Sequence, residues 1–481
     1  MARGREPISH IHLAFNSGSI NQFNCSLMLK QNLSIKGEKA YSIMGFVDNF
    51  SVRQSLLRYS MSLELSIRDS AGLVDESVMR VGSVLILSLF RDPADPPEAK
   101  IEKYFYITHI DNSIQSTTPN ERVYDITAFT YSGVSNAWPM TKVYGTGGKA
   151  ETGDSGLPSD IIKDIVKTRF TSHPEEVGED TISWIPSEHI LDTPTIFKQV
   201  APFDAITNML RRCTRTNKDS TYFFYEDKDK YKLRTIGDMT KQEYRDAAFE
   251  YTMRPDKKLT GDIKEDYYKV LYLTQHNNSN YFSILENGIH SSEVVYIDLL
   301  NRTVGNNNKI NLFNYSDEEH RKTLLNIEDE PRFDAFDLTK EIFEYRGFAE
   351  GLETGSTQSD EQYDLTPASK IVFSENAWDR KDYVHEKYPY DVAQRALFEQ
   401  NKITIEVYGN PQLRPGDMVK LVAPKETQQD GQAYRISGLF LITAVKHNIS
   451  GNRFQTIVDL HKDSYETDVL TGSKDNSGTQ S

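Results

Sequence analysis

The stretch Arg414–Leu421 (RPGDMVKL) decides the fold, because a similar stretch, Arg80–Leu87 (RVGSVLIL), lies near the other end of the chain. In both copies an Ile-Thr pair follows the glycine, and its threonine, Thr108 or Thr443, lies 26 or 27 residues after that glycine. Alternating apolar residues, which are typical of half-buried strands, precede and follow both copies. This repetition predicts a duplicated small β-domain.

The composition limits the classes of function. A length of 481 residues allows several domains, at about 150 residues each. The aromatic share of 11% favours strands, because aromatic rings pack well on pleated surfaces. A net charge of −15 argues against sequence-specific DNA binding as the main role, but suits a duct through which DNA slides without sticking.

The cysteines and the termini indicate a protein made in a reducing compartment. Cys25 and Cys213 are too few for a disulfide framework or a thiolate metal site, so we expect two unpaired thiols. No secretory signal follows Met1, and no run approaches the ~18 apolar residues of a membrane helix. We therefore expect a soluble product without membrane insertion of its own, assembled in a cytoplasm.

A change of character after Trp138 separates a β-rich region, 1–138, from an α/β region, 139–260. Ser159-Asp160 is expected to cap one helix, and Pro202 to open another. A hairpin is predicted to join the aromatic run Tyr222–Tyr225 to Tyr231–Arg234 across a polar turn.

Strands return after this region, at Tyr268–Thr274 and Glu293–Leu300, with a turn at Asn287-Gly288. We assign 261–310 and 392–466 to a second β-domain, with a helix ending near 392–400. An irregular or helical insertion, 311–391, carries a loop at 351–362, and a disordered tail occupies 467–481. The predicted fold class is mainly β with an inserted α/β domain, α+β overall.

Two motifs resemble binding loops but lack essential residues. Gly145–Ala150 has neither the spacing nor the hydroxyl of a phosphate loop, which indicates a linker. Asp227 and Asp229 are spaced as in a calcium loop, but Tyr231 and Lys232 stand where an oxygen ligand and a glycine are required, so we expect a hairpin turn.

The histidines do not indicate a metal or catalytic site. His10 and His12 share one strand face without an identifiable third ligand. His109 and His447 lie near the ends of equivalent strands and are expected to be half-buried. We predict no catalytic residues, no metal-binding residues, no cofactor and no enzymatic activity.

The C-terminal copy resembles the baseplate central hub protein of contractile-tailed bacteriophages, a family that extends to type VI secretion spike proteins. Tyr408–Val419 matches the family's G-x-P-x-L-x-P-G-D turn, and Ser437–His447 matches its S-G-x-F-x-I-x-x-V-x-H strand. Looser likeness extends to three further segments: Asn287–Leu299, Pro202–Ile206 and Tyr222–Tyr225. The N-terminal copy departs from the pattern, with Val81 and Ser83 where the second copy has Pro415 and Asp417.

The resemblance implies two tail-tube-like antiparallel β-barrel domains per chain and a homotrimer that presents six of them in a ring. Such a ring would match a sixfold tail tube protein on one side and seat a threefold central spike protein on the other, beside baseplate wedge proteins. DNA would pass transiently through the centre without specific contacts. The chain would lie in the virion, at the tail baseplate, after assembly in the host bacterial cytoplasm.

Two other functions remain open from the sequence. One is the hub portion of a type VI secretion spike or of a phage-like contractile injection device, although fused spikes continue beyond the position of Ser481. The other is a tail-associated enzyme that degrades cell wall, for which no acidic residue stands out as a catalyst.

Overall fold

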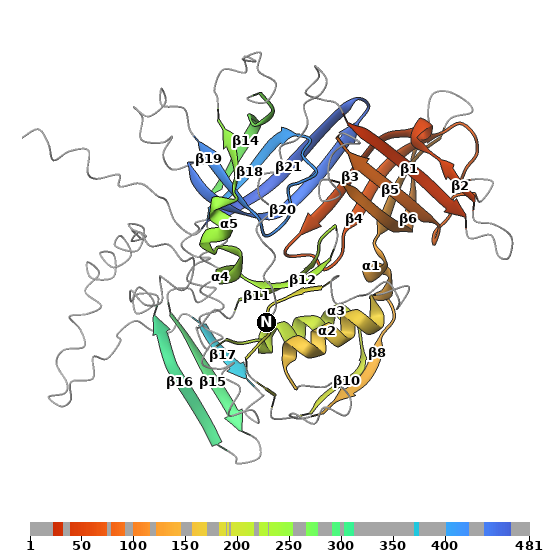
Figure 1. Cartoon of the computed structure of the whole chain (residues 1–481). Coiled ribbons are helices and arrows are strands. Elements are labelled where there is room, and N and C mark those ends of the chain that lie inside the picture. The colour runs from red at the N-terminus through yellow and green to blue at the C-terminus, as the bar shows by residue number, and fades with distance from the viewer. Residues whose placement is uncertain are drawn as a thin grey trace, which may run out of the picture.

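The computed structural model describes the following residues: 23–31, 39–74, 78–91, 100–115, 122–145, 156–170, 182–188, 190–191, 194–215, 221–228, 230–253, 266–277, 291–298, 303–311, 370–374, 401–422 and 437–462. Its largest feature is a 13-stranded sheet that contains strands from both ends of the chain (Figure 1). The mainly-β class predicted from the sequence is confirmed.

The N-terminal part of this sheet is the first strand set. Its hydrogen-bonded order is β3-β4-β7-β6-β5-β1-β2. The strands are β1 (Asn24–Gln31), β2 (Lys39–Ser42), β3 (Val47–Ser55), β4 (Ser62–Asp69), β5 (Val84–Phe90), β6 (Ile101–Gln115) and β7 (Arg122–Phe129). A 3-10 turn, η1 (Met44–Phe46), connects β2 to β3.

The C-terminal part, the second strand set, repeats this arrangement. Its order is β14-β18-β21-β20-β19, and each strand takes the position of β3, β4, β7, β6 and β5 in turn. The strands are β13 (Phe249–Thr252), β14 (Val270–Asn277), β18 (Asn401–Tyr408), β19 (Met418–Val422), β20 (Gly438–Ser450) and β21 (Arg453–Lys462). The predicted duplication is thus confirmed in strand order. The two sets differ at one end: β19 pairs in parallel with β13, whereas its counterpart β5 pairs antiparallel with β1.

The two sets do not close into separate barrels among the described residues. Instead β20 pairs antiparallel with β3, and one sheet runs from β14 to β2. Each of these strands would otherwise expose an edge, and pairing satisfies both edges at once.

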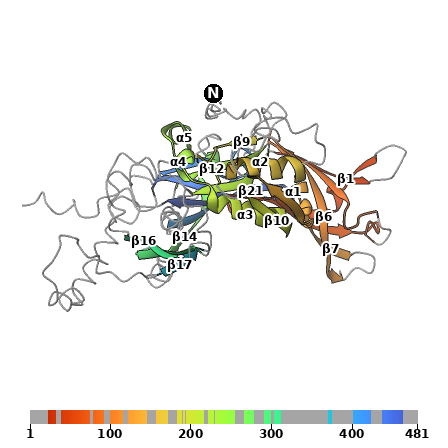
Figure 2. The same cartoon turned by 90° about the horizontal axis from the view of Figure 1, so that it is seen from below.

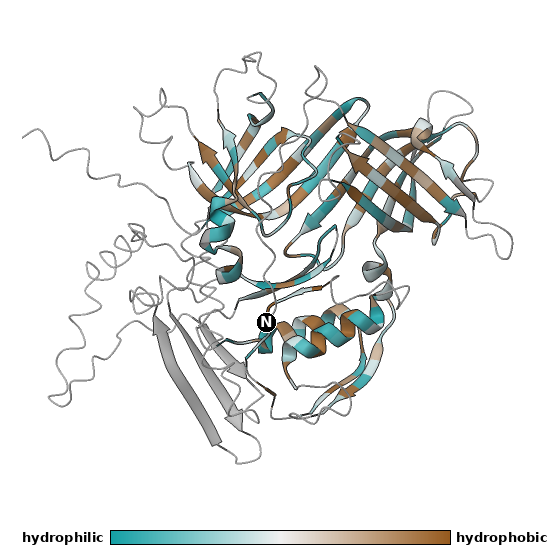
Figure 3. Cartoon of the chain, viewed as in Figure 1, coloured by the Kyte–Doolittle hydropathy of each residue, from teal (hydrophilic) through white to brown (hydrophobic). Residues whose placement is uncertain are grey.

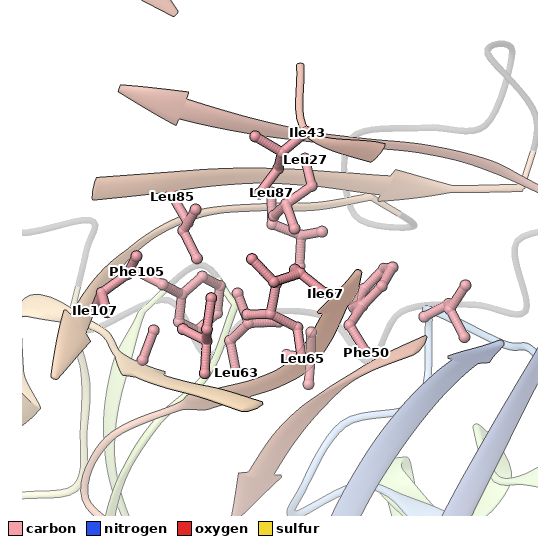
Figure 4. Close-up of a cluster of buried hydrophobic side chains, with 14 of the residues drawn as sticks. Leu27, Ile43, Phe50, Leu63, Leu65, Ile67, Leu85, Leu87, Phe105 and Ile107 are labelled. Carbon is pink, nitrogen blue, oxygen red and sulfur yellow. The ribbon is translucent and has the colours of Figure 1, made fainter. Parts of the chain in front are cut away.

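The first strand set folds over its own hydrophobic core. Leu27 and Leu85, from β1 and β5, face Leu63 and Leu65 of β4 across buried space (Figure 4). Burying each such side chain contributes roughly 1.5–3 kcal/mol. The second set has a separate core that includes Ile405, Val419 and Phe440.

The inserted region lies below the large sheet in Figure 1, and α2 and α3 lie in front of the sheet's strands in the view from below (Figure 2). A short helix, α1 (Tyr131–Ser135), ends the first region and leads into the inserted one. The elements of the inserted region are β8 (Met140–Tyr144), α2 (Pro158–Arg169), β9 (Ile182–Trp184), β10 (Thr195–Val200), α3 (Pro202–Arg212), β11 (Tyr222–Glu226), β12 (Tyr231–Thr235), α4 (Ile236–Met239) and α5 (Gln242–Asp246). Apolar residues of both longer helices and of these strands share one core.

Local patterns predicted this region well, with one error. Helix α3 begins at Pro202, and β11 and β12 form the expected antiparallel hairpin. The cap predicted at Ser159-Asp160 is wrong, because Pro158 takes the first helical position and Leu157 is the cap. The Ser159 hydroxyl instead accepts a hydrogen bond from the Ser187 backbone N–H at 3.0 Å.

A further sheet joins β15 (Ser291–Asp298) to β16 (Thr303–Asn311) and, in parallel, to β17 (Lys370–Ser374). The strands expected near 268–274 and 293–300 correspond to β14 and β15. Of these two strands, only β14 belongs to the second strand set. The described part of the 311–391 insertion includes β17, which pairs with β15. The features expected at 287–288, 351–362, 392–400 and 467–481 lie outside the described residues.

Hydropathy follows the strands. Hydrophobic and hydrophilic bands alternate along the large sheet, as one buried and one exposed face require (Figure 3). Of the described helices, none is both long and apolar enough to cross a membrane.

Candidate functional site

The candidate site is the junction where the two strand sets meet. Seven residue pairs join β20 to β3, from Ala444 opposite Ser55 to Ser450 opposite Asn49. The Leu56 N–H extends the contact by donating to the Thr443 carbonyl at 2.8 Å. The pairing at the junction runs without a register shift. It therefore fixes the position of one strand set relative to the other.

The repeated sequence forms the same turn in both sets. Gly82 and Gly416 have φ angles of 88° and 87°, in the left-handed region that only glycine adopts readily. Their N–H groups donate to equivalent carbonyls, those of Ile107 at 2.7 Å and Ile442 at 2.8 Å.

The strand after each turn carries the same irregularity. The register shifts between Ile107 and His109 in β6 and between Ile442 and Ala444 in β20, which places Thr108 and Thr443 at equivalent bulges. Each threonine hydroxyl donates to a carbonyl of the next strand, and both oxygen–oxygen distances are 3.1 Å. The two copies are therefore equivalent residue by residue in this part of the sheet.

The surroundings of the two turns differ. A Cβ atom at Gly416 would lie 2.5 Å from the Tyr225 hydroxyl and 3.0 Å from the Met239 sulfur, whereas a Cβ at Gly82 would meet nothing within 4 Å. Pro415 is buried, and its counterpart Val81 is 60% exposed. The β11–β12 hairpin and α4 of the inserted region thus cover the second turn and leave the first one open.

Glu226, at the end of β11, fixes the hairpin to the first strand set. Its carboxylate accepts hydrogen bonds from the Thr130 and Ser132 hydroxyls at 2.5 and 2.9 Å. Lys103 of β6 lies 3.0 Å away and forms an ion pair with it. Glu226 is buried, so these partners replace the water that it has lost.

The next residue, Asp227, faces the second strand set. Its carboxylate lies 2.6 Å from the Lys232 ammonium and 3.5 Å from the guanidinium of Arg414, in the repeated turn. Burial raises the pKa of Asp227, but Lys232 and Arg414 outweigh burial and hold the pKa well below its usual range. Lys228 adds a bond to the Pro411 carbonyl at 3.1 Å. Consecutive acids thus tie one hairpin to both strand sets.

The sequence indicated Asp227 only as part of a turn and did not indicate Glu226. An available signal was their position directly after the aromatic run Tyr222–Tyr225, because acids in a buried hairpin need cationic or hydrogen-bonding partners. Both carboxylates are held by protein donors, and the arrangement fixes geometry rather than presenting a reactive group.

The histidines expected to be half-buried differ from that prediction. His447 is fully buried at the junction, where its Nδ1 lies 3.1 Å from the Thr456 hydroxyl, and burial lowers its pKa to about 3. His109 is 64% exposed and lies 2.9 Å from Asp111. The two histidines are not at equivalent positions, because the bulges align His109 with Ala444 and His447 with position 112, and residues three apart in a strand face opposite sides of the sheet.

The remaining motifs form no joint site. Cys25 and Cys213 are free cysteines. The positions of His10, His12 and Asp229, and of the stretch 146–150, lie outside the described residues. Across the part of the chain that the structure describes, no group of three or more His, Cys, Asp or Glu side chains is arranged to hold a metal ion.

Comparison with known proteins gives a phage relative. No family model matches the chain. A protein of Vibrio phage KVP40 named "Probable baseplate hub protein gp334" is 23% identical over 322 residues, which cover 66% of this chain and 68% of that protein.

Similar solved structures include the tail protein from Neisseria meningitidis MC58, with TM-score 0.49 and 10% identity, covering 92% of this chain and 97% of that one. Another is the 43 kDa tail protein of prophage MuSo2 from Shewanella oneidensis, with TM-score 0.49 and 9% identity, covering 91% and 98%. The sequence match to gp334 confirms what the C-terminal turn and strands predicted, namely that the chain resembles phage baseplate hub proteins.

Proposed function

We propose that this protein is the structural central hub of a contractile phage tail baseplate, in which three chains form a ring of six strand sets. The observation that carries the proposal is the repeated strand order together with the β3–β20 junction. A chain that already holds two equivalent units side by side needs only threefold assembly to present six of them. The relative's name, a baseplate hub protein, supports the same role.

In this proposal the six strand sets act as tail-tube-like units that match a sixfold tail tube. The single inserted region of each chain keeps the assembly threefold, which suits a threefold spike, and wedge proteins surround the ring. The net charge of −15 suits a passage in which DNA does not adhere. The protein would lie in the virion tail after assembly in the bacterial cytoplasm, and its role would be geometric rather than enzymatic.

The proposed domain division follows the sequence. Residues 1–138 and 261–310 with 392–466 would form the tube-like units, 139–260 the insert, and 311–391 and 467–481 additions to them. Strands β13 and β15 depart from this division: β13 pairs with the second strand set from within 139–260, and β15 pairs outside that set from within 261–310. The separate cores of the first set, the insert and the second set support the main part of this division.

Mass photometry of the purified chain, alone and mixed with its tail tube and spike partners, tests the proposal. We expect a particle of three times the 55.0 kDa chain mass. A protein that stays monomeric at micromolar concentration both alone and with its partners would overturn it. A zymogram on peptidoglycan should show no clearing, and clearing abolished by a single acid substitution would support an enzyme instead.

A further inference from the structure

The free edges of the large sheet show where one chain can meet the next. β14 is the counterpart of β3: each pairs with the strand that follows it in the order of its set, and each carries one register shift. The shift lies between Val47 and Asn49 in β3 and between Val270 and Tyr272 in β14. Position 272 therefore corresponds to position 49, and the following residues correspond in order.

The same reasoning relates β6 to β20. The bulges at Thr108 and Thr443 set the correspondence, so 109–112 in β6 match 444–447 in β20, before a second register shift between Asn112 and Ile114 that β20 lacks. Residues 444–450 are the ones that pair with β3 at the junction.

Both counterparts lack the neighbour that the junction provides. Residues 109–115 of β6 pair with β7 on one side, and β14 pairs with β18 on one side. No other described strand pairs with either edge. Tyr272 is 63% exposed, and the side chain of Asp111 is 65% exposed.

We propose that β14 of one chain pairs antiparallel with β6 of the next chain, in the register of the β3–β20 junction. Lys446 opposite Arg53 in the junction becomes Asp111 opposite His276. The occupant of each free edge is thus a second copy of this chain. The inference rests on the proposed function and specifies the contact that closes its ring.

The charges at the two edges fit this register. His276 lies opposite Lys402, so the cross-strand row that begins at His276 holds a lysine. Asp111 would extend that row with an acid, so the row would carry opposite charges from the two neighbouring chains. Because the two edges are different surfaces, the contact is heterologous, and it ends either in a closed ring or in an open filament.

Cysteine cross-linking in the full-length protein tests the register. Directly opposed residues in an antiparallel pair have Cα atoms about 4.5–5.5 Å apart, within the range that a disulfide spans. The variant Asp111→Cys with His276→Cys, oxidised mildly, should give a covalent trimer on a non-reducing gel that returns to single chains on reduction. The matched control, Asp111→Cys with Thr274→Cys, moves one thiol two residues out of register and should cross-link at least tenfold less.

The native thiols should contribute little background. Burial raises the pKa of Cys25 to about 12 and also raises that of buried Cys213, so neither forms the reactive thiolate readily. Each single-cysteine variant, oxidised in the same way, measures what background remains.

The outcomes separate this inference from the proposed function. A trimer by mass photometry without a disulfide in the designed pair overturns the β6–β14 contact and leaves the hub role intact. Equal cross-linking of the control pair overturns the register, and a covalent ladder beyond three chains overturns ring closure. A monomer by mass overturns the proposed function itself.

Discussion

Gly82 and Gly416 share one backbone conformation but not one environment. Replacing either with alanine forces a side chain into left-handed backbone, at about 1–2 kcal/mol. Only Gly416→Ala also drives a Cβ into the Tyr225 hydroxyl and the Met239 sulfur. We therefore expect Gly416→Ala to lower the free energy of unfolding by at least about 1 kcal/mol more than Gly82→Ala, measured by urea denaturation.

Tyr225→Phe provides the matched control for this pair of glycines. The Tyr225 hydroxyl is buried, and no hydrogen-bond partner for it is found in the described part of the chain, so its removal alone should cost little. Combined with Gly416→Ala, it should recover part of the lost stability, while it should recover nothing in Gly82→Ala. Equal losses for both glycines would contradict the role assigned to the covered turn.

His447 predicts how stability depends on pH. Burial lowers the pKa of His447 to about 3 and that of His461 to about 4, while histidines in an unfolded chain titrate near 6.5. Between about pH 6.5 and 4 the unfolded chain thus binds more protons than the folded one. The stability contributed by these neutral histidines is complete above pH 6.5 and falls as the pH drops, with a slope of up to about 1.4 kcal/mol per pH unit for each.

His447→Asn, which places at 447 the residue found at the equivalent position 112, should flatten this slope. We expect the difference in unfolding free energy between pH 8 and pH 5 to shrink by about 1–2 kcal/mol, measured by urea denaturation at both values. Parallel pH profiles for the variant and the parent protein would show that His447 does not titrate in this way.

At the scale of elements, the β11–β12 hairpin joins the insert to both strand sets, and its hold on the first set depends on Glu226 and Lys103. Glu226→Gln leaves Lys103 without its counter-charge in a largely buried place and should cost on the order of 3 kcal/mol. Adding Lys103→Met should restore part of that loss. Urea denaturation of both single variants and the double variant gives the coupling energy, and additive losses would mean that the pair does not hold the hairpin.

Elements defined by local chemistry could be predicted from the sequence. The helix at Pro202 follows from proline geometry, and the hairpin follows from the aromatic run Tyr222–Tyr225 and the polar turn after it. The repeated turn also appeared in sequence, because left-handed backbone requires the glycine. The cap predicted at Ser159 was wrong because Pro158 takes the first helical position, which makes Leu157 the cap.

Pairings between distant strands could not be predicted in this way. The β3–β20 junction and the parallel β13–β19 pair join edges that carry no local signature of their partner. The clamp at Glu226 and Asp227 was missed for a related reason, since its cations come from β6 and from the turn at Arg414. Such contacts appear only once the elements are placed in space.

At the scale of the whole molecule, two strand sets and one insert per chain would give the proposed assembly two symmetries. In the proposed trimer, six strand sets would be related by an approximate sixfold, but there would be only three inserts, since each chain has one. That insert covers the turn at Gly416 and leaves the turn at Gly82 open. We expect a cryo-electron microscopy reconstruction without imposed symmetry to show six similar lobes in the layer of the strand sets and three in the layer of the inserts. Averaging about the sixfold should preserve the first layer and blur the second. Lobes that alternate between two different shapes around the strand-set layer would contradict the equivalence of the two sets, which the shared turns and bulges require.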